Sequence, residues 1–209
     1  YDSNKNRLLV INDNGEVFAH DIYSNKFGQR YKIKGKNIIL NPYWDRHVLY
    51  DSNKNRLLVV NCKGEVFAYE LDNDSIGISY KINGEGILYT TEWDKYVVFD
   101  SIKNRLLVVN RKGEIFGHDL NENSVIDSYR INGKNIILNP DWDRFIFFDQ
   151  SNNRLVVTNC IGETFGHDLK EKCIETPYRI DGMSIVNNVC TIRNLLYNSK
   201  KKKKKQVRS

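Results

Sequence analysis

Several features of well-known protein classes are scarce or absent in this chain. Only three prolines occur in 209 residues, and 40% of the residues are hydrophobic, which excludes a collagen-like or low-complexity disordered polymer. No apolar run approaches the roughly 18–20 residues that a membrane-spanning helix needs. The first residues, Tyr1-Asp2-Ser3, show neither the basic nor the apolar region of a signal peptide, so secretion and a cytoplasmic location both stay open. A globular chain is predicted.

Cysteine is scarce too, with four residues in the chain. Cys62 and Cys160 lie 98 residues apart, and Cys173 and Cys190 both lie in the last quarter. This spacing contains no CxxC pair and differs from the dense frameworks of small secreted proteins. We predict free thiols and no metal site, with Cys173 and Cys190 as the one pair whose disulfide bonding merits a test.

Acidic residues are missing from one segment, the last ten residues. Those residues hold seven basic side chains, which account for the net charge of +6, because the other 199 residues carry 25 basic against 26 acidic groups. We predict a nearly neutral body and a disordered tail. A lysine run without aromatic residues would bind nucleic acid or anionic surfaces non-specifically and in a salt-dependent way. The lysines are Lys200, Lys201, Lys202, Lys203, Lys204 and Lys205.

The chain contains an internal repeat with a period of 49 residues. Trp44, Trp93 and Trp142 are each 49 residues apart. A Gly-Glu-x-Phe motif and a Tyr-(Lys/Arg)-Ile motif recur four times with the same spacing and no insertion. The glycines of the first motif are Gly15, Gly64, Gly113 and Gly162. Four repeats therefore fill the body of the chain, at about residues 1–49, 50–98, 99–147 and 148–199.

Each repeat has the pattern of four short strands joined by turns. In the third repeat, strands are predicted at 96–99, 105–109, 114–118 and 128–131, with a longer Asn/Glu/Ser loop before the last. The first two strands are apolar on both faces and the last alternates, as expected when the first strand lies at the crowded centre of a propeller and the last faces solvent. The predicted fold class is all-β, a four-bladed β-propeller.

The two ends of the chain match each other. Residues 193–200, Arg-Asn-Leu-Leu-Tyr-Asn-Ser-Lys, resemble residues 46–53, Arg-His-Val-Leu-Tyr-Asp-Ser-Asn. A C-terminal strand at Asn194 to Tyr197 would thus complete the blade that begins at Tyr1 and close a ring. A fragment of a longer repeat array would show the same matching ends, so both interpretations stay open.

The fourth repeat carries a family resemblance. Its run from Trp142 to Asp149, its Gly162-Glu163-Thr164-Phe165 and its Tyr178-Arg179-Ile180-Asp181-Gly182 resemble a blade of the tachylectin-2-like propeller lectins. In those lectins a Trp precedes an aromatic first strand and an Ile-Gly step closes the blade. The resemblance implies a sugar-binding protein. Four blades is the number found in hemopexin-like domains, which implies a protein- or ligand-binding module as the alternative.

The Trp residues are the best candidates for ligand binding. Each is followed by an Asp and a basic residue in the segment that crosses between blades. An indole face can stack on a sugar ring, and a carboxylate can accept hydroxyl hydrogen bonds. The alternative is that each Trp wedges between blades and each Asp pairs with the following base. The candidates are Trp44, Asp45, Trp93, Asp94, Trp142 and Asp143; in the fourth repeat Thr191 replaces the Trp.

Other patterns point to structural roles. His20, His118 and His167 are repeat-equivalent and each precedes an Asp, but neighbouring side chains of a strand point to opposite faces, so no catalytic pair is expected. The loop from Asp2 to Asn6 begins like a calcium loop, yet Arg7 stands where that loop needs Gly, so a turn is predicted. Asn73-Asp74-Ser75 is a glycosylation sequon.

We therefore expect a multivalent carbohydrate-binding propeller that is not an enzyme and needs no cofactor. Its partners would be glycans or glycoproteins. A hemopexin-like protein-interaction module, and polyanion binding through the lysine tail, are the alternatives.

Overall fold

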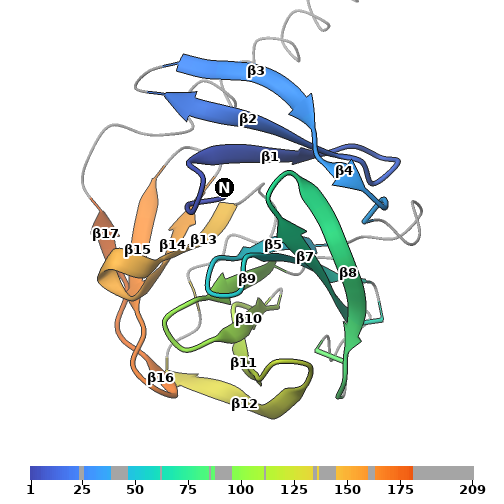
Figure 1. Cartoon of the computed structure of the whole chain (residues 1–209). Helices are drawn as coiled ribbons and strands as arrows, with labels where there is room; N and C mark the ends of the chain where they lie inside the picture. The colour runs from blue at the N-terminus through green and yellow to red at the C-terminus, as the bar shows by residue number, and fades with distance from the viewer. Residues whose placement is uncertain are drawn as a thin grey trace, which may run out of the picture. The chain divides into compact units, whose positions relative to one another are not determined.

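The chain is described by a computed structural model that covers residues 1–23, 26–38, 47–61, 63–84, 86–87, 96–110, 112–133, 136, 145–159 and 163–180. It is all-β and has the predicted four-bladed β-propeller fold (Figure 1). Two compact units divide the chain: Tyr1–Asn110 with Ile115–Ile131, and Arg111–Glu114 with Asn132–Ser209. Among the described residues, the one helical element is the 3-10 turn η1 (Gln150–Asn152), and none is a helix that could cross a membrane.

Each repeat forms one antiparallel meander. The predicted four strands are confirmed in the second, third and fourth repeats, and the first has three strands among the described residues. The first contains β1 (Arg7–Ile11), β2 (Val17–Tyr23) and β3 (Lys26–Lys32). The second contains β5 (His47–Asp51), β6 (Arg56–Val60), β7 (Val66–Asp72) and β8 (Ser75–Ile82). The third contains β9 (Tyr96–Asp100), β10 (Arg105–Val109), β11 (Ile115–Leu120) and β12 (Val125–Gly133). The fourth contains β13 (Phe145–Asp149), β14 (Arg154–Thr158), β15 (Thr164–Asp168) and β17 (Tyr178–Ile180).

One prediction about the third repeat was wrong. The expected long Asn/Glu/Ser loop is only a short turn, because β11 continues to Leu120 and β12 already begins at Val125. Most side chains in the first half of β12 are exposed. An edge strand with polar residues facing solvent resembles a loop in composition, so the composition of the first half of β12 predicted a loop. The predicted closing strand, Asn194 to Tyr197, lies outside the described residues.

The cores of the first unit lie between consecutive meanders. Val17, Ala19 and Ile33 of the first repeat pack in one cluster with Leu57 and Val59 of β6. The other face of β6 packs in the same way with the third repeat, through a cluster that includes Leu58, Val60, Leu106 and Val108. Because β6 has a packed neighbour on each face, all of its residues are buried, as the continuous apolar pattern predicted. The residues of β10 are buried as well.

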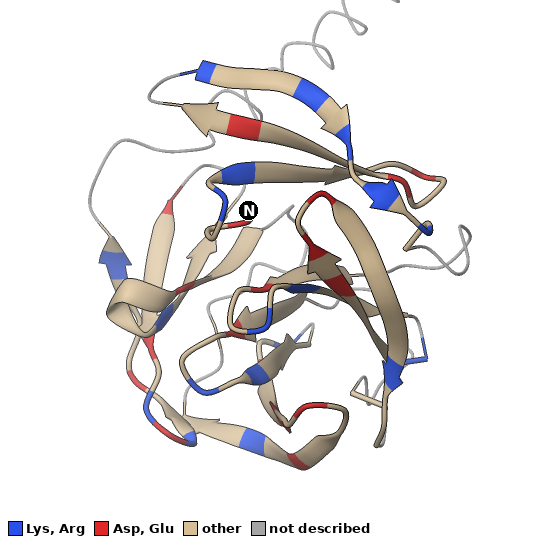
Figure 2. Ribbon diagram, viewed as in Figure 1, with Lys and Arg blue, Asp and Glu red and all other residues tan. Residues whose placement is uncertain are grey.

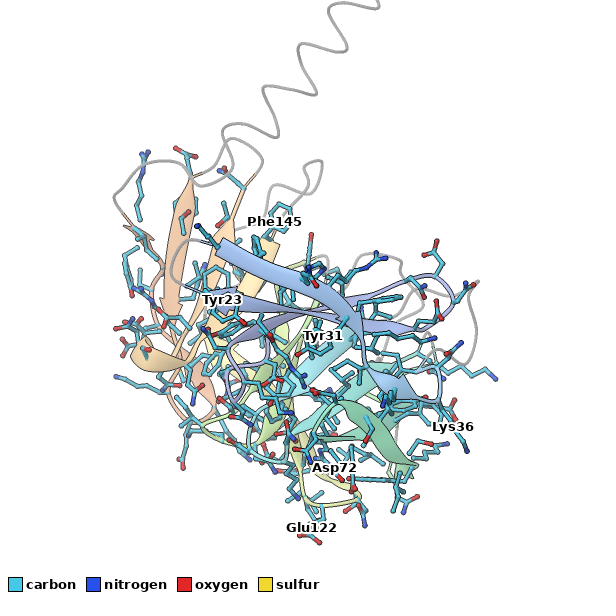
Figure 3. All side chains as sticks on the ribbon, turned by 45° about the horizontal axis from the view of Figure 1, so that its top comes forward. Tyr23, Tyr31, Lys36, Asp72, Glu122 and Phe145 are labelled. Carbon is cyan, nitrogen blue, oxygen red and sulfur yellow. The ribbon has the colours of Figure 1, made fainter. Side chains whose placement is uncertain are left out.

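The prediction that the first two strands of a repeat are buried fails in two places. Phe145 and Phe147 on one face of β13 are 56% and 48% exposed. Figure 3 labels Phe145. Leu8 and Val10 of β1 are 37% and 42% exposed, whereas the equivalent Leu57 and Val59 are almost fully buried. Along both strands, more exposed and less exposed side chains alternate. One face of each strand is therefore covered, and the face that carries these four residues is not covered by described residues.

Consecutive meanders are also joined at their outer strands, a link that the sequence did not predict. The short strand β4 (Lys34–Gly35) follows β3 and pairs in parallel with the start of β8. Asn83 makes the equivalent bridge to Ser124, and the end of β12 pairs with β16 (Cys173–Ile174). The first two repeats thus join the end of their last strand to the next meander, and the third pairs the end of its last strand with β16.

Glycine is required at this outer step. Gly35 has φ +117°, and a Cβ atom there would lie 2.5 Å from the carbonyl oxygen of Ile76. Gly84 and Gly133 have similar positive φ values of 125° and 120°. The recurring Gly after the Tyr-(Lys/Arg)-Ile motif is therefore explained by the close approach of two backbones.

Gly35→Ala should destabilise the protein by about 2–4 kcal/mol, because it combines positive-φ strain with a backbone clash. Urea denaturation followed by far-UV circular dichroism measures the free energy of unfolding. Gly77→Ala is the matched control, since its Cβ would meet only the Glu70 carbonyl oxygen at an ordinary 3.8 Å. Equal losses in the two variants would contradict the assigned role of Gly35.

Candidate functional site

The six predicted ligand residues lie outside the described part of the chain, but the residues on both sides of each Trp segment are described. The six predicted ligand residues are Trp44, Asp45, Trp93, Asp94, Trp142 and Asp143. The flanking residues determine at which edge of a meander each segment begins and ends.

Each Trp segment begins at a buried isoleucine. The backbone N–H of Ile38 donates to the carbonyl oxygen of Gly15 at 2.9 Å, and Ile38 is fully buried. Ile87 and Gly64 make the same bond at 2.9 Å, as do Ile136 and Gly113. The entry to all three segments is therefore fixed against the turn between the second and third strands of the same repeat.

Each segment ends at the first residue of a strand on the same edge. His47 begins β5 opposite Val60, the last residue of β6 before the turn that contains Gly64. Tyr96 begins β9 opposite Val109, and Phe145 begins β13 opposite Thr158. Both ends of each Trp segment thus lie at the edge that carries these glycine turns, which we call the Gly-turn edge.

The glycine turns are held by one asparagine each. The Oδ1 atom of Asn61 accepts from the backbone N–H groups of Lys63 and Glu65, both at 2.9 Å, and its Nδ2 donates to Glu65 Oε2 at 2.7 Å. Gly64, at φ 76°, completes the turn. The turns at Asn12 and Asn159 have the same bonds to Glu16 and Glu163. The recurring Asn and Gly-Glu therefore form a structural turn.

The glutamates of these turns also meet a base on the outer strand. Glu65 accepts from Lys81 at 2.6 Å, Glu16 pairs with Lys32, and Glu163 lies 3.4 Å from Arg179. The Lys81 and Asn61 hydrogen bonds lower the pKa of Glu65, and Lys32 and Asn12 do the same for Glu16. The Gly-turn edge consequently presents paired charges at the glycine turns of the first, second and fourth repeats.

The opposite edge holds a buried cluster that the sequence interpretation missed. Arg105 donates from Nε to Asp100 Oδ2 at 2.7 Å and from Nη1 to the Tyr129 hydroxyl at 2.9 Å, and that hydroxyl donates to Asp119 Oδ1 at 2.8 Å. Arg105 and Asp100 are fully buried. We call the edge of the meander that carries this cluster the Arg edge. Equivalent pairs are Asp2 with Arg7, Asp51 with Arg56 and Asp149 with Arg154.

A sequence signal for these clusters existed. An Asp and an Arg recur five residues apart in all four repeats, with a Tyr 24 residues beyond the Arg. Burial alone would raise the pKa of Asp2, but hydrogen bonds from Arg7, Tyr50 and the Lys5 N–H hold it below its usual value. Charges of both signs are spread over the described strands and turns (Figure 2), in keeping with the nearly neutral body.

The calcium-like loop is the predicted turn. Asp2 Oδ1 accepts from the backbone N–H groups of Asn4 and Lys5, at 3.0 and 3.2 Å, and Oδ2 accepts from Arg7. The carboxylate is thus used within the loop. Asn6 has φ 49° and supplies the left-handed residue of the turn. Among the described residues, no group of three or more His, Cys, Asp or Glu could hold a metal ion.

The His-Asp pairs diverge, as predicted. His118 Nδ1 lies 2.9 Å from Ser128 Oγ, whereas Asp119 accepts from Tyr129 on the other face of the sheet. His118 and His167 are fully buried, and burial lowers the pKa of each to about 4. Both imidazoles are therefore neutral at physiological pH and help to fill the interior.

The remaining predicted features are only partly described. Cys173 is an exposed free thiol, and Cys62, Cys160 and Cys190 lie outside the described residues. The sequon residue Asn73 is exposed in the β7–β8 turn. The lysines Lys200 to Lys205 of the tail lie outside the described residues.

Comparison with known proteins bears on the fold. No family model matches the sequence, and no curated protein matches it. A structural genomics protein of unknown function from Bacteroides thetaiotaomicron is similar in structure, with 12% identity and a TM-score of 0.51 over 82% of this chain and 40% of that one. At this identity the likeness concerns the fold alone.

Two further structures have lower scores. The β-propeller domain of Cps50 (Swd1) from Myceliophteria thermophila is 14% identical, with a TM-score of 0.43 over 86% of this chain and 58% of that one. The dihydro-heme d1 dehydrogenase NirN is 12% identical, with a TM-score of 0.41 over 88% of this chain and 36% of that one. This chain spans less than two thirds of the length of all three.

The buried histidines should make the protein sensitive to acid. Because the pKa of His167 is about 4 in the folded chain and near 6.5 when unfolded, the unfolded state binds more protons between these values. Stability should fall as the pH drops from about 6.5 to 4, and His167→Phe should remove on the order of 1–3 kcal/mol of that loss. Phe is a suitable replacement because the second repeat buries another aromatic residue, Tyr69, at the equivalent position.

Urea denaturation at a series of pH values measures this loss. Tyr69→Phe, at the equivalent buried position of the second repeat, is the control and should leave this acid dependence unchanged, because a phenol hydroxyl does not titrate between pH 4 and 6.5. If His167→Phe shows the same fall in stability as the parent chain, the buried neutral imidazole does not determine the acid response.

Proposed function

We propose that this chain is a multivalent carbohydrate-binding propeller whose ligand sites lie at the Gly-turn edge, one in each of three repeats. Trp44, Trp93 and Trp142 would each stack on a sugar ring. Asp45, Asp94 and Asp143 would accept hydrogen bonds from its hydroxyl groups. No catalytic group or cofactor takes part in this proposal.

The anchoring of the Trp segments is the observation that supports the proposal most. Each segment has eight residues between a buried isoleucine and the first residue of a strand, for example between Ile38 and His47. Both anchors lie at the Gly-turn edge. A short segment held at both ends in the same way in three repeats supports three similar sites at the same edge.

The chemistry of that edge fits a polar ligand with flat apolar faces. The paired charges of Glu65 and Lys81, and of Glu16 and Lys32, provide donors and acceptors near the Trp segments. Aromatic rings bind sugars through the apolar face of the pyranose, and carboxylates bind hydroxyl groups. The resemblance of the repeat to tachylectin-2-like lectins agrees with this ligand class.

Multivalency would supply the affinity. A shallow site that holds one sugar binds weakly, but several sites that engage one glycan-bearing surface increase the overall affinity by about 10²–10⁴-fold when the spacing allows it. The proposal therefore concerns branched or clustered glycans rather than free monosaccharides.

A glycan array with the intact chain and with the triple variant Trp44/Trp93/Trp142→Ala tests the proposal. The parent should bind a subset of glycans, and the triple variant should lose at least ten-fold in apparent affinity. Each single variant should weaken binding to clustered glycans more than binding to a monovalent sugar, because avidity is lost first.

Tyr23→Ala is the matched control. Tyr23 is a 59% exposed aromatic residue at the end of β2, at the other end of the meander from the Gly-turn edge (Figure 3). It should bind as the parent does. A well-folded parent without any glycan signal, or a triple variant with unchanged binding, would refute the lectin proposal.

The polyanion alternative has its own test. Deletion of residues 200–209 should abolish retention on a heparin column without changing the glycan array. If glycan binding disappears with the tail, the binding is charge-driven and the Trp sites are not responsible.

A further inference from the structure

The Arg edge presents different charges at two equivalent junctions of the first unit. At the first, Arg7 Nη1 donates to Asp74 Oδ1 at 2.8 Å, and Lys5 Nζ lies 3.4 Å from the same oxygen. Asp74 belongs to the β7–β8 turn of the next repeat. A carboxylate from the second repeat thus lies between two cations of the first.

At the second junction this carboxylate is missing. Forty-nine residues further on, Arg56 and Lys54 face the β11–β12 turn, where Asn123 stands at the position of Asp74. Arg56 Nη1 donates instead to the backbone carbonyl of Glu122 at 2.9 Å. Arg56 Nη2 is buried and has no hydrogen-bond partner among the described residues. Figure 3 labels Asp72 and Glu122, which mark the two turns.

The charges at the two junctions differ accordingly. At the first, Arg7 and Lys5 are balanced by Asp2 and Asp74. At the second, Asp51 is the only carboxylate that contacts Arg56 among the described residues. The Glu122 side chain is 84% exposed and lies 3.9 Å from Lys54, so solvent screens it strongly. Arg56 therefore keeps an unused guanidinium donor in a buried corner, where the exposed Glu122 is the carboxylate that offsets the charge of Lys54.

We propose that the corner formed by Arg56, Lys54 and the β11–β12 turn binds a small inorganic anion, with chloride as the representative ligand. The anion would accept from Arg56 Nη2, whose counterpart Arg7 Nη2 donates to the Asn73 carbonyl oxygen at 3.4 Å. It would also supply the negative charge that Asp74 supplies at the first junction. A charged donor left unsatisfied in the interior is costly, and an anion satisfies its hydrogen bond and its charge together. Glu122 and Asn123, which cover the corner, are exposed, so the site lies beneath one surface turn.

Thermal unfolding of the full chain tests this site when chloride replaces gluconate, a much larger anion, at constant ionic strength. The Tm should rise by about 2–5 °C for each tenfold increase in chloride above its dissociation constant. Line broadening in chloride NMR, reversed by nitrate, should report the same binding. A Tm that is identical in the two salts, or a site filled by water only, overturns the proposal.

Two reciprocal variants locate the effect. Asn123→Asp supplies the missing carboxylate and should abolish the chloride dependence, whereas Asp74→Asn empties the first junction and should increase it. Asn121→Asp and Asp72→Asn make the same charge changes at neighbouring exposed positions of the two turns and should behave as the parent does. If Asn123→Asp keeps the parent's chloride dependence, the anion does not bind at Arg56.

Discussion

The ion pair between an arginine at the start of a repeat's second strand and the aspartate five residues before it organises each meander. The guanidinium of Arg105 joins the turn before β10 through Asp100, and β12 through Tyr129. It therefore connects segments that are distant in the repeat. Removing one partner of such a buried pair leaves an uncompensated charge and typically costs about 3–5 kcal/mol. The strands that carry the outer joints and the Gly-turn edge depend on this arrangement.

The four repeats can be compared with one another as natural variants of one meander. Where Asp21, Asp119 and Asp168 accept from the neighbouring tyrosine, the second repeat has the exposed Glu70. Where two repeats bury a histidine, the second buries Tyr69. The framework of Asp, Arg and Tyr stays the same while its partners change. Differences between repeats therefore indicate which positions are free to acquire a separate role.

Much of the fold could be predicted from the sequence because the repeat is regular. The strands of the third repeat followed from the apolar pattern and are confirmed, although the last one begins three residues before its predicted start. The parallel joint between outer strands could not be predicted, since it depends on how closely two backbones approach. A glycine such as Gly35 indicates only that the backbone there can adopt a positive φ. For the candidate site, the sequence predicts the segment that carries each Trp, and Ile38 and the start of β5 show that its ends lie at the Gly-turn edge. The sequence does not determine which ligand such a site would bind.

The outer joint also affects how the chain would come apart. Because Lys34 and Gly35 extend the sheet of the second repeat, and Asn83 bridges to the third, the first two repeats each pair with the outer edge of their successor. Opening one repeat would expose an unpaired edge on the next one. Such coupling between nearest neighbours is typical of repeat proteins that unfold as a cooperative series. A protease that cleaves within one outer strand would therefore weaken two consecutive repeats at once.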